Sequence, residues 1–163
     1  MLQQHLAEQF ESALIQLKNE INAYTHKEHV WEIRGDIKNS GGTLTLHLLG
    51  NINHFIGAVL GNTGYLRNRA AEFADRNIPT SKLMKEVDEC AYRVKNIISN
   101  LTDAQLLGDY PLVDGKQWKT SDARLIQLLS HLNYHLGQVN YHRRLFDQPV
   151  SLPDEVMQLS YKN

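Results

Sequence analysis

The sequence has few of the features that mark a specialised class of protein. Cys90 is its single cysteine, which excludes an intramolecular disulfide and any zinc site built from several cysteines. No run of 18 apolar residues occurs, and the N-terminal stretch MLQQHLAEQFESAL is too polar for a signal peptide. We therefore expect a soluble, cytoplasmic protein without a membrane partner. The 17 Lys and Arg residues nearly balance the 18 Asp and Glu residues, and this lack of a basic excess argues against a nucleic-acid partner.

What remains is the composition of a globular domain. Of the 163 residues, 42% are hydrophobic and 21% are charged. A chain of this length buries roughly two thirds of the surface that its unfolded state exposes, which is enough for a stable core without disulfide bonds. We expect one domain that spans residues 1–163.

Apolar residues recur at spacings of three and four in four long segments, which predicts four amphipathic helices. The first covers residues 6–24. The second begins with Thr43 as its N-cap and ends near Leu60; the third is capped by Thr80 or Ser81 and reaches Leu101; the fourth is opened by Thr120 or Ser121 and ends near Phe146. The tail after Pro149 is either a short helix or frayed.

The connections after the first and third predicted helices are longer than simple turns require, and residues 110–118 resemble a short hairpin around an Asp-Gly turn. With four long helices and no convincing core strand, the economical fold is all-α, an antiparallel four-helix bundle.

Eight histidines are present, and several fall on the flanks of predicted buried faces. His131 and His135 are four residues apart, which places their rings about 40° apart in rotation and about 6 Å apart along one helix. His47 and His54 share a flank of the second helix but lie about 10 Å apart in rise, so only one of them fits a compact site with that pair. Neutral imidazole is the commonest ligand of transition metals, and three imidazoles with open positions are typical of a reactive metal centre. The spacing does not decide between His47 and His54.

Other polar residues near these histidines allow two interpretations each. Asn51 either orients the ring of His47 or is an amide at a helix interface. Gln138 either lines the pocket and binds a ligated water, or is a buried glutamine paired with a backbone carbonyl. His142 lies about 10 Å beyond His135 along the helix, too far to share its ion.

The remaining candidates are assigned to the core, to the ends of the bundle or to solvent. Cys90 lies on the apolar face of the third helix, so we interpret it as a core residue. Trp31 and Trp118 either wall a pocket at the mouth of the bundle or plug the end of its core. Several arginines either bind a carboxylate or thiol cofactor or are solvated at the surface: Arg34, Arg67, Arg69, Arg143 and Arg144.

Two motifs carry a resemblance to a known family. The segments TLHLLGN, at residues 45–51, and LSHLNYHLGQ, at residues 129–138, resemble the DinB/YfiT-like superfamily, which has one histidine on the second helix and an HxxxHxGQ-like pattern on the last long helix. The resemblance implies a four-helix bundle, often a homodimer, that binds a divalent metal ion, zinc or nickel, through three histidines. It assigns the ligands to His47, His131 and His135, and leaves His54 and His142 as outer residues of the pocket or surface residues.

Some families of this superfamily are thiol-dependent enzymes, and the resemblance therefore implies a small-molecule substrate and a low-molecular-weight thiol as cofactor. One hypothesis is a metal-dependent thiol S-transferase or hydrolase that works at the three histidines. The alternative is a non-catalytic or stress-related bundle protein in which the ion is structural. No residue is assigned as catalytic.

Overall fold

The structure is a computed structural model that describes residues 1–111, 113, 115 and 119–147 of the chain. These residues form helices and connections, without a named strand, so the predicted all-α class is confirmed. The elements are α1 (Leu2–Asn22), a 3₁₀ helix η1 (Lys27–Trp31), α2 (Gly41–Ile52), a π-helical segment η2 (Asn53–Ala58), α3 (Arg69–Ala74), α4 (Thr80–Ser99), α5 (Asp103–Leu107) and α6 (Ser121–Phe146).

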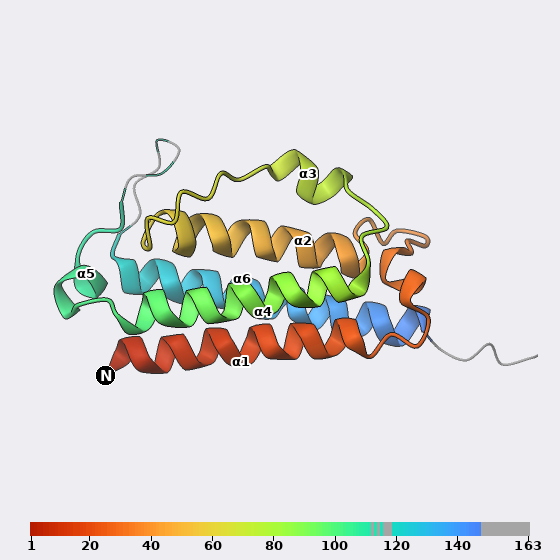
Figure 1. Cartoon of the computed structure of the whole chain (residues 1–163), viewed down its shortest axis with the longest axis horizontal. Helices are drawn as coiled ribbons and strands as arrows, with labels where there is room; N and C mark the ends of the chain where they lie inside the picture. Colours follow the sequence, from red (N-terminus) through yellow and green to blue (C-terminus); the bar gives the residue numbers. More distant parts are fainter. Residues whose placement is uncertain (112, 114, 116–118, 148–163) are drawn as a thin grey trace, which may run out of the picture.

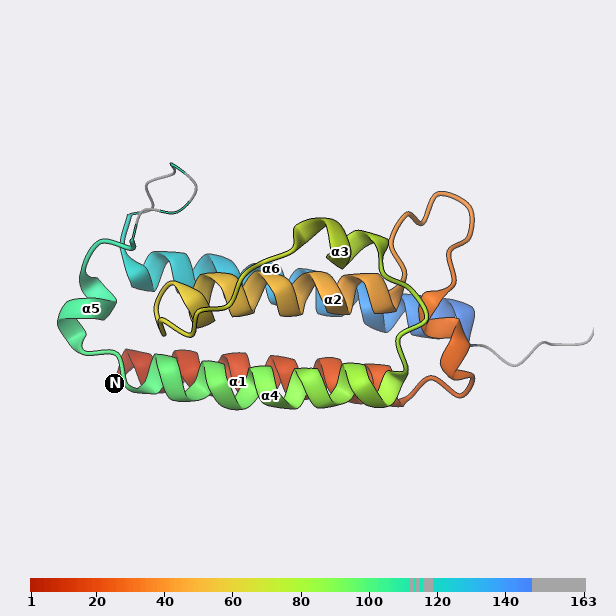
Figure 2. The same ribbon diagram turned by 45° about the horizontal axis from the view of Figure 1, so that its top comes forward.

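The four long helices lie side by side in two pairs, α1 with α4 and α2 with α6 (Figures 1 and 2). Both pairs are antiparallel. The ion pairs Lys18–Asp88 and Glu11–Lys95 fix the direction of α1 against α4. By contrast, α2 and α4 run in the same direction, as Figure 1 shows, so consecutive long helices do not simply alternate.

Because α2 and α4 are parallel, the chain must return along the molecule between them. Residues 59–79 make this crossover and carry the short helix α3, which lies over α2 (Figure 2). The sequence predicted long connections after the first and third long helices, at residues 23–40 and 100–120, and the structure has both. The crossover is a third long connection that the sequence analysis did not single out. It is the one that reaches the site described below.

The second predicted helix differs from the prediction at both ends. The α-helix stops at Ile52 and continues as the π-helical η2 to Ala58, instead of running as one helix to about Leu60. The N-cap is Ser40 rather than Thr43: the Ser40 hydroxyl accepts a hydrogen bond from the backbone N–H of Thr43 at 3.1 Å. Gly41 and Gly42 are the first two helical residues instead of a turn. Tertiary packing explains this, because a Cβ on Gly42 would lie 2.6 Å from the Trp31 ring.

The other ends need only small corrections. The N-cap of α4 is Pro79, without a side-chain cap, one residue before the predicted Thr80. The N-cap of α6 is Thr120 and the helix ends at Phe146, as predicted. The predicted hairpin lies largely outside the described residues; Asp109 and Thr120, which flank it, form an antiparallel bridge. Trp118 and the tail after Asp147 also lie outside the described residues.

The apolar faces of the long helices form one core, and the predicted stripes supply most of it. Cys90 is completely buried in that core, which confirms its assignment. Trp31 packs against the core edge, and its indole N–H donates to the Ile78 carbonyl at 3.2 Å, so it plugs the end of the core. Within the described part of the chain, no helix has both the length and the apolar character of a membrane span.

Candidate metal centre

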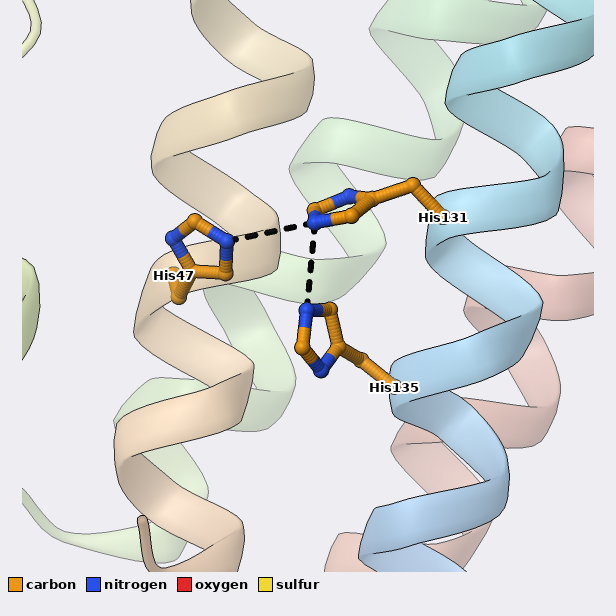
Figure 3. Close-up of side chains that lie close together, drawn as sticks. All are labelled: His47, His131 and His135. Carbon is orange, nitrogen blue, oxygen red and sulfur yellow. Dashed lines mark hydrogen bonds between the residues drawn. The ribbon is translucent and has the colours of Figure 1, made fainter. Parts of the chain in front are cut away.

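Three histidine rings from two helices point at a common spot (Figure 3). His47 comes from α2, and His131 and His135 come from successive turns of α6. The His131 Nε2 atom lies 3.4 Å from His47 Nε2 and 3.1 Å from His135 Nε2. All three ligand atoms lie within 4.8 Å of one another. The structure thus brings together the three histidines that the sequence singled out.

The spacing of these nitrogens fits a single bound ion. Zinc–imidazole bonds are about 2.0–2.1 Å long, so two nitrogens of a tetrahedral site lie about 3.3 Å apart. Two of the three separations, 3.4 and 3.1 Å, lie close to that value. The third, between His47 and His135, is at most 4.8 Å, so the three imidazoles are close enough together to hold one divalent ion.

Hydrogen bonds at the outer nitrogens set the tautomers that such a site needs. His47 Nδ1 lies 2.9 Å from a Glu72 carboxylate oxygen, and His135 Nδ1 lies 2.6 Å from the Gln138 side-chain carbonyl. Both partners are acceptors, so each Nδ1 carries the proton and donates it. The Nε2 atom of each ring is then left with a lone pair that faces the centre.

The crossover, residues 59–79, places Glu72 beside His47. It belongs to α3, is buried, and also accepts hydrogen bonds from Arg67 Nε at 2.6 Å and from Arg67 Nη2 at 2.9 Å. Burial alone raises the pKa of Glu72, but the hydrogen bonds from Arg67 and His47 outweigh it, and the net pKa is lowered. Glu72 is therefore an ionised acceptor that can hold the His47 ring in place.

A glycine makes room for this carboxylate. The Glu72 side chain crosses α2 at Gly50, where a Cβ would lie 2.6 Å from Glu72 Cδ and 3.0 Å from Cγ. Real Cβ atoms essentially never approach as close as 2.6 Å, and 3.0 Å is tighter than nine in ten real Cβ contacts. The absence of a side chain at position 50 is thus part of how Glu72 reaches His47.

The environment keeps two of the imidazoles neutral. Burial, together with the neighbouring rings of His135 and His47, lowers the pKa of His131 to about 4. Burial also lowers the pKa of His47, although Glu72 opposes this shift. Both rings are therefore unprotonated at neutral pH, which is the state that binds a metal ion.

The lowered pKa of His131 predicts a pH-dependent stability of the metal-free protein. The unfolded chain takes up a proton at His131 near pH 6.5, while the folded chain does so only near pH 4. Protonation in that window therefore favours the unfolded state, and the free energy of unfolding decreases as the pH falls from 6.5 to about 4. Urea denaturation across this pH range should show a smaller loss of unfolding free energy in His131→Asn than in the wild type. Equal losses of unfolding free energy in the two proteins would contradict the assignment of this pH dependence to His131.

The structure places the other candidate residues outside the ligand set, as predicted for His54 and His142. Asn51 does not orient His47, because Glu72 occupies that role; it is buried between helices, and its Oδ1 has no hydrogen-bond partner among the described residues. His54 lies in η2 with its ring beside Phe55, 4.7 Å between centroids, and does not belong to the three-histidine group. His142 is buried and pairs with the Tyr24 hydroxyl and the Glu32 carbonyl, so it lies apart from the site.

Gln138 contacts the site through His135. It is exposed, so the interpretation as a buried glutamine paired with the backbone is wrong. Sequence reasoning also missed Glu72 altogether. It lies in a polar stretch without periodicity, and no local signal marks it; only the path of the crossover over α2 brings it to His47.

The arrangement can hold an ion with one side open to ligands. His47 is 6% exposed, whereas His131 and His135 are only half-buried. Three protein ligands with open positions are typical of catalytic rather than structural metal sites. The Cys90 thiol cannot take part, because it is buried in the core and burial raises its pKa to about 12. Compared with known proteins, the chain matches no family model, no curated protein and no solved structure.

Proposed function

We propose that the chain is a divalent-metal-binding protein of the DinB/YfiT-like superfamily, in which His47, His131 and His135 hold zinc or nickel. The observation that carries the proposal is the convergence of three Nε2 atoms at separations that suit one ion. The pairing of α1 with α4 and of α2 with α6 is compatible with the bundle that the resemblance implies. The homodimer and the cytoplasmic location remain predictions.

We further propose that this site makes the protein a metal-dependent enzyme, a thiol-dependent S-transferase or a hydrolase. When bound, the ion would supply a Lewis acid that lowers the pKa of a thiol or a water at neutral pH. Glu72 and Gln138 keep the ligand rings in the correct tautomer and orientation. The buried Cys90 leaves the thiol to come from outside the chain, as a low-molecular-weight cofactor.

The test begins with the metal itself. Protein purified without an affinity tag is expected to bind one equivalent of zinc or nickel, measured by elemental analysis and by titration with each metal. In the Co²⁺-loaded protein, glutathione should add a sulfur-to-metal charge-transfer band, because open positions accept a thiolate. A protein that binds no ion would overturn the metal site. A protein that binds Co²⁺ with an unchanged spectrum in thiol would overturn the thiol chemistry.

Removing the metal separates the enzyme from the structural alternative. The buried core of the long helices does not depend on the ion, so the chelator-treated protein should keep its helical circular dichroism and a cooperative thermal transition. Its melting temperature should fall only by the amount that corresponds to the lost free energy of metal binding. Loss of the helical signal on chelation would instead favour the structural ion.

A further inference from the structure

A cavity lies beside the segment of α6 that follows His135, with Gln138 in its lining. It has a volume of about 430 Å³ and lies between residues 36–39 of the first connection, the start of α2 and the last third of α6. This volume is within the range of small-molecule sites, about 300–1,000 Å³.

Most of the wall area is apolar and comes from Ile37, Leu44, Tyr141 and Leu145, beside the charged Asp36 and Lys38 of the first connection. Tyr141 is 75% exposed and Leu145 is 55% exposed, so both lie at the open edge of the pocket. His142 also lines the pocket, but its two ring nitrogens are taken by the Tyr24 hydroxyl at 2.7 Å and the Glu32 carbonyl at 2.8 Å. The pocket therefore suits an alkyl or aryl group.

Gln138 links this pocket to the metal centre. Its side chain lines the pocket, and its carbonyl oxygen lies 2.6 Å from His135 Nδ1. A molecule in the pocket therefore lies one side chain, that of Gln138, away from His135.

The charge balance at the proposed metal centre favours a ligand with an anionic head group. An imidazole must be neutral to bind a metal ion, and the charge of Glu72 is matched by its ion pair with Arg67. The protein therefore leaves the charge of a bound divalent ion uncompensated. An anionic ligand such as a thiolate or a hydroxamate would neutralise part of it.

We propose, on the basis of the proposed metal site, that this pocket holds the apolar part of a small molecule whose anionic head reaches His47, His131 and His135. The substrate class of the proposed function is thereby narrowed to compounds with a metal-ligating head and an alkyl or aryl tail.

A series of alkyl hydroxamates tests this inference in the Zn²⁺-loaded protein by calorimetry. Acetohydroxamate, butanohydroxamate, hexanohydroxamate and octanohydroxamate share one metal-binding head and differ only in the tail. Affinity should rise by up to about fourfold for each methylene that enters the pocket, from the transfer free energy of a buried CH₂. Equal affinities along the series would overturn the proposal.

Two matched variants test whether the alkyl tail of the hydroxamate lies in this pocket. Leu145→Glu puts a carboxylate at the pocket edge and should abolish the dependence on tail length while acetohydroxamate binding is unchanged. Ile126→Glu makes the same change at another exposed position of α6, 51% exposed and not among the pocket residues, and should keep the dependence. A dependence that survives in Leu145→Glu would overturn the proposal. If even acetohydroxamate fails to bind, the open metal site is wrong, and the pocket proposal falls with it.

Discussion

Replacing His131 with alanine is expected to lower the affinity for a divalent ion by roughly 100- to 1,000-fold. His131 is the central ligand, because its Nε2 lies within 3.4 Å of the Nε2 atoms of both His47 and His135. Structural zinc sites with four ligands bind with about 10–16 kcal/mol, so one ligand contributes about 2.5–4 kcal/mol. Competition titration with a chromogenic chelator measures the loss directly.

His5→Ala is the matched control for this variant. His5 lies on α1, is exposed and does not belong to the three-histidine group. Its removal should leave the affinity unchanged, and both variants should keep the circular dichroism of the wild type. A His131→Ala protein that binds the ion as tightly as the wild type would rule out this centre. Metal binding that is weakened equally in His5→Ala would point to nonspecific chelation.

Gly50→Ala is expected to weaken metal binding by about 10- to 100-fold, although residue 50 is not a ligand. The new methyl group would occupy the space of the Glu72 carboxylate, which is held there by Arg67 and His47. Glu72 must then move away from His47, and loss of such an outer hydrogen bond typically costs 10- to 100-fold in metal affinity. Calorimetric titration of the variant with Zn²⁺ checks the result.

The control for Gly50→Ala is the same substitution at Gly137, two residues from His135. A Cβ at Gly137 would meet nothing within 4 Å, so metal binding should be unchanged and the helix should be stabilised by up to about 1 kcal/mol. Glu72→Gln tests the mechanism, because it keeps the size of the side chain but removes the charge that pairs with Arg67. It should weaken binding in the same direction as Gly50→Ala. Wild-type affinity in Glu72→Gln would show that the carboxylate does not support His47.

The long helices and the pair His131 and His135 were accessible from the sequence because they depend on local periodicity. The i, i+4 spacing of His131 and His135 places both rings on one face of any helix, whatever the rest of the fold. The stripe that contains Cys90 likewise predicted a buried residue, and the structure confirms it. The choice of His47 over His54 needed the family resemblance, because periodicity alone left both possible.

The start of α2 shows where such reasoning fails. Adjacent glycines such as Gly41 and Gly42 are typical of a turn, yet both are helical, and Tyr24 and Trp31 pack so close to them that no side chain would fit. A contact between residues distant in sequence changed the meaning of a local signal. Gly50 is a similar case. It lies inside α2 rather than in a turn, and its lack of a side chain leaves room for the Glu72 carboxylate.

The sequence by itself determined the helical class, the approximate ends of the long helices and the three imidazoles that are candidates for one ion. Only the tertiary structure decided that α2 runs parallel to α4, that the resulting crossover carries Glu72 and Arg67 to the back of His47, and that an apolar pocket lies beside Gln138. Periodicity reports which face of a helix is buried, but not which distant residue covers it. That second choice depends on the direction of each helix and on the path of its connections.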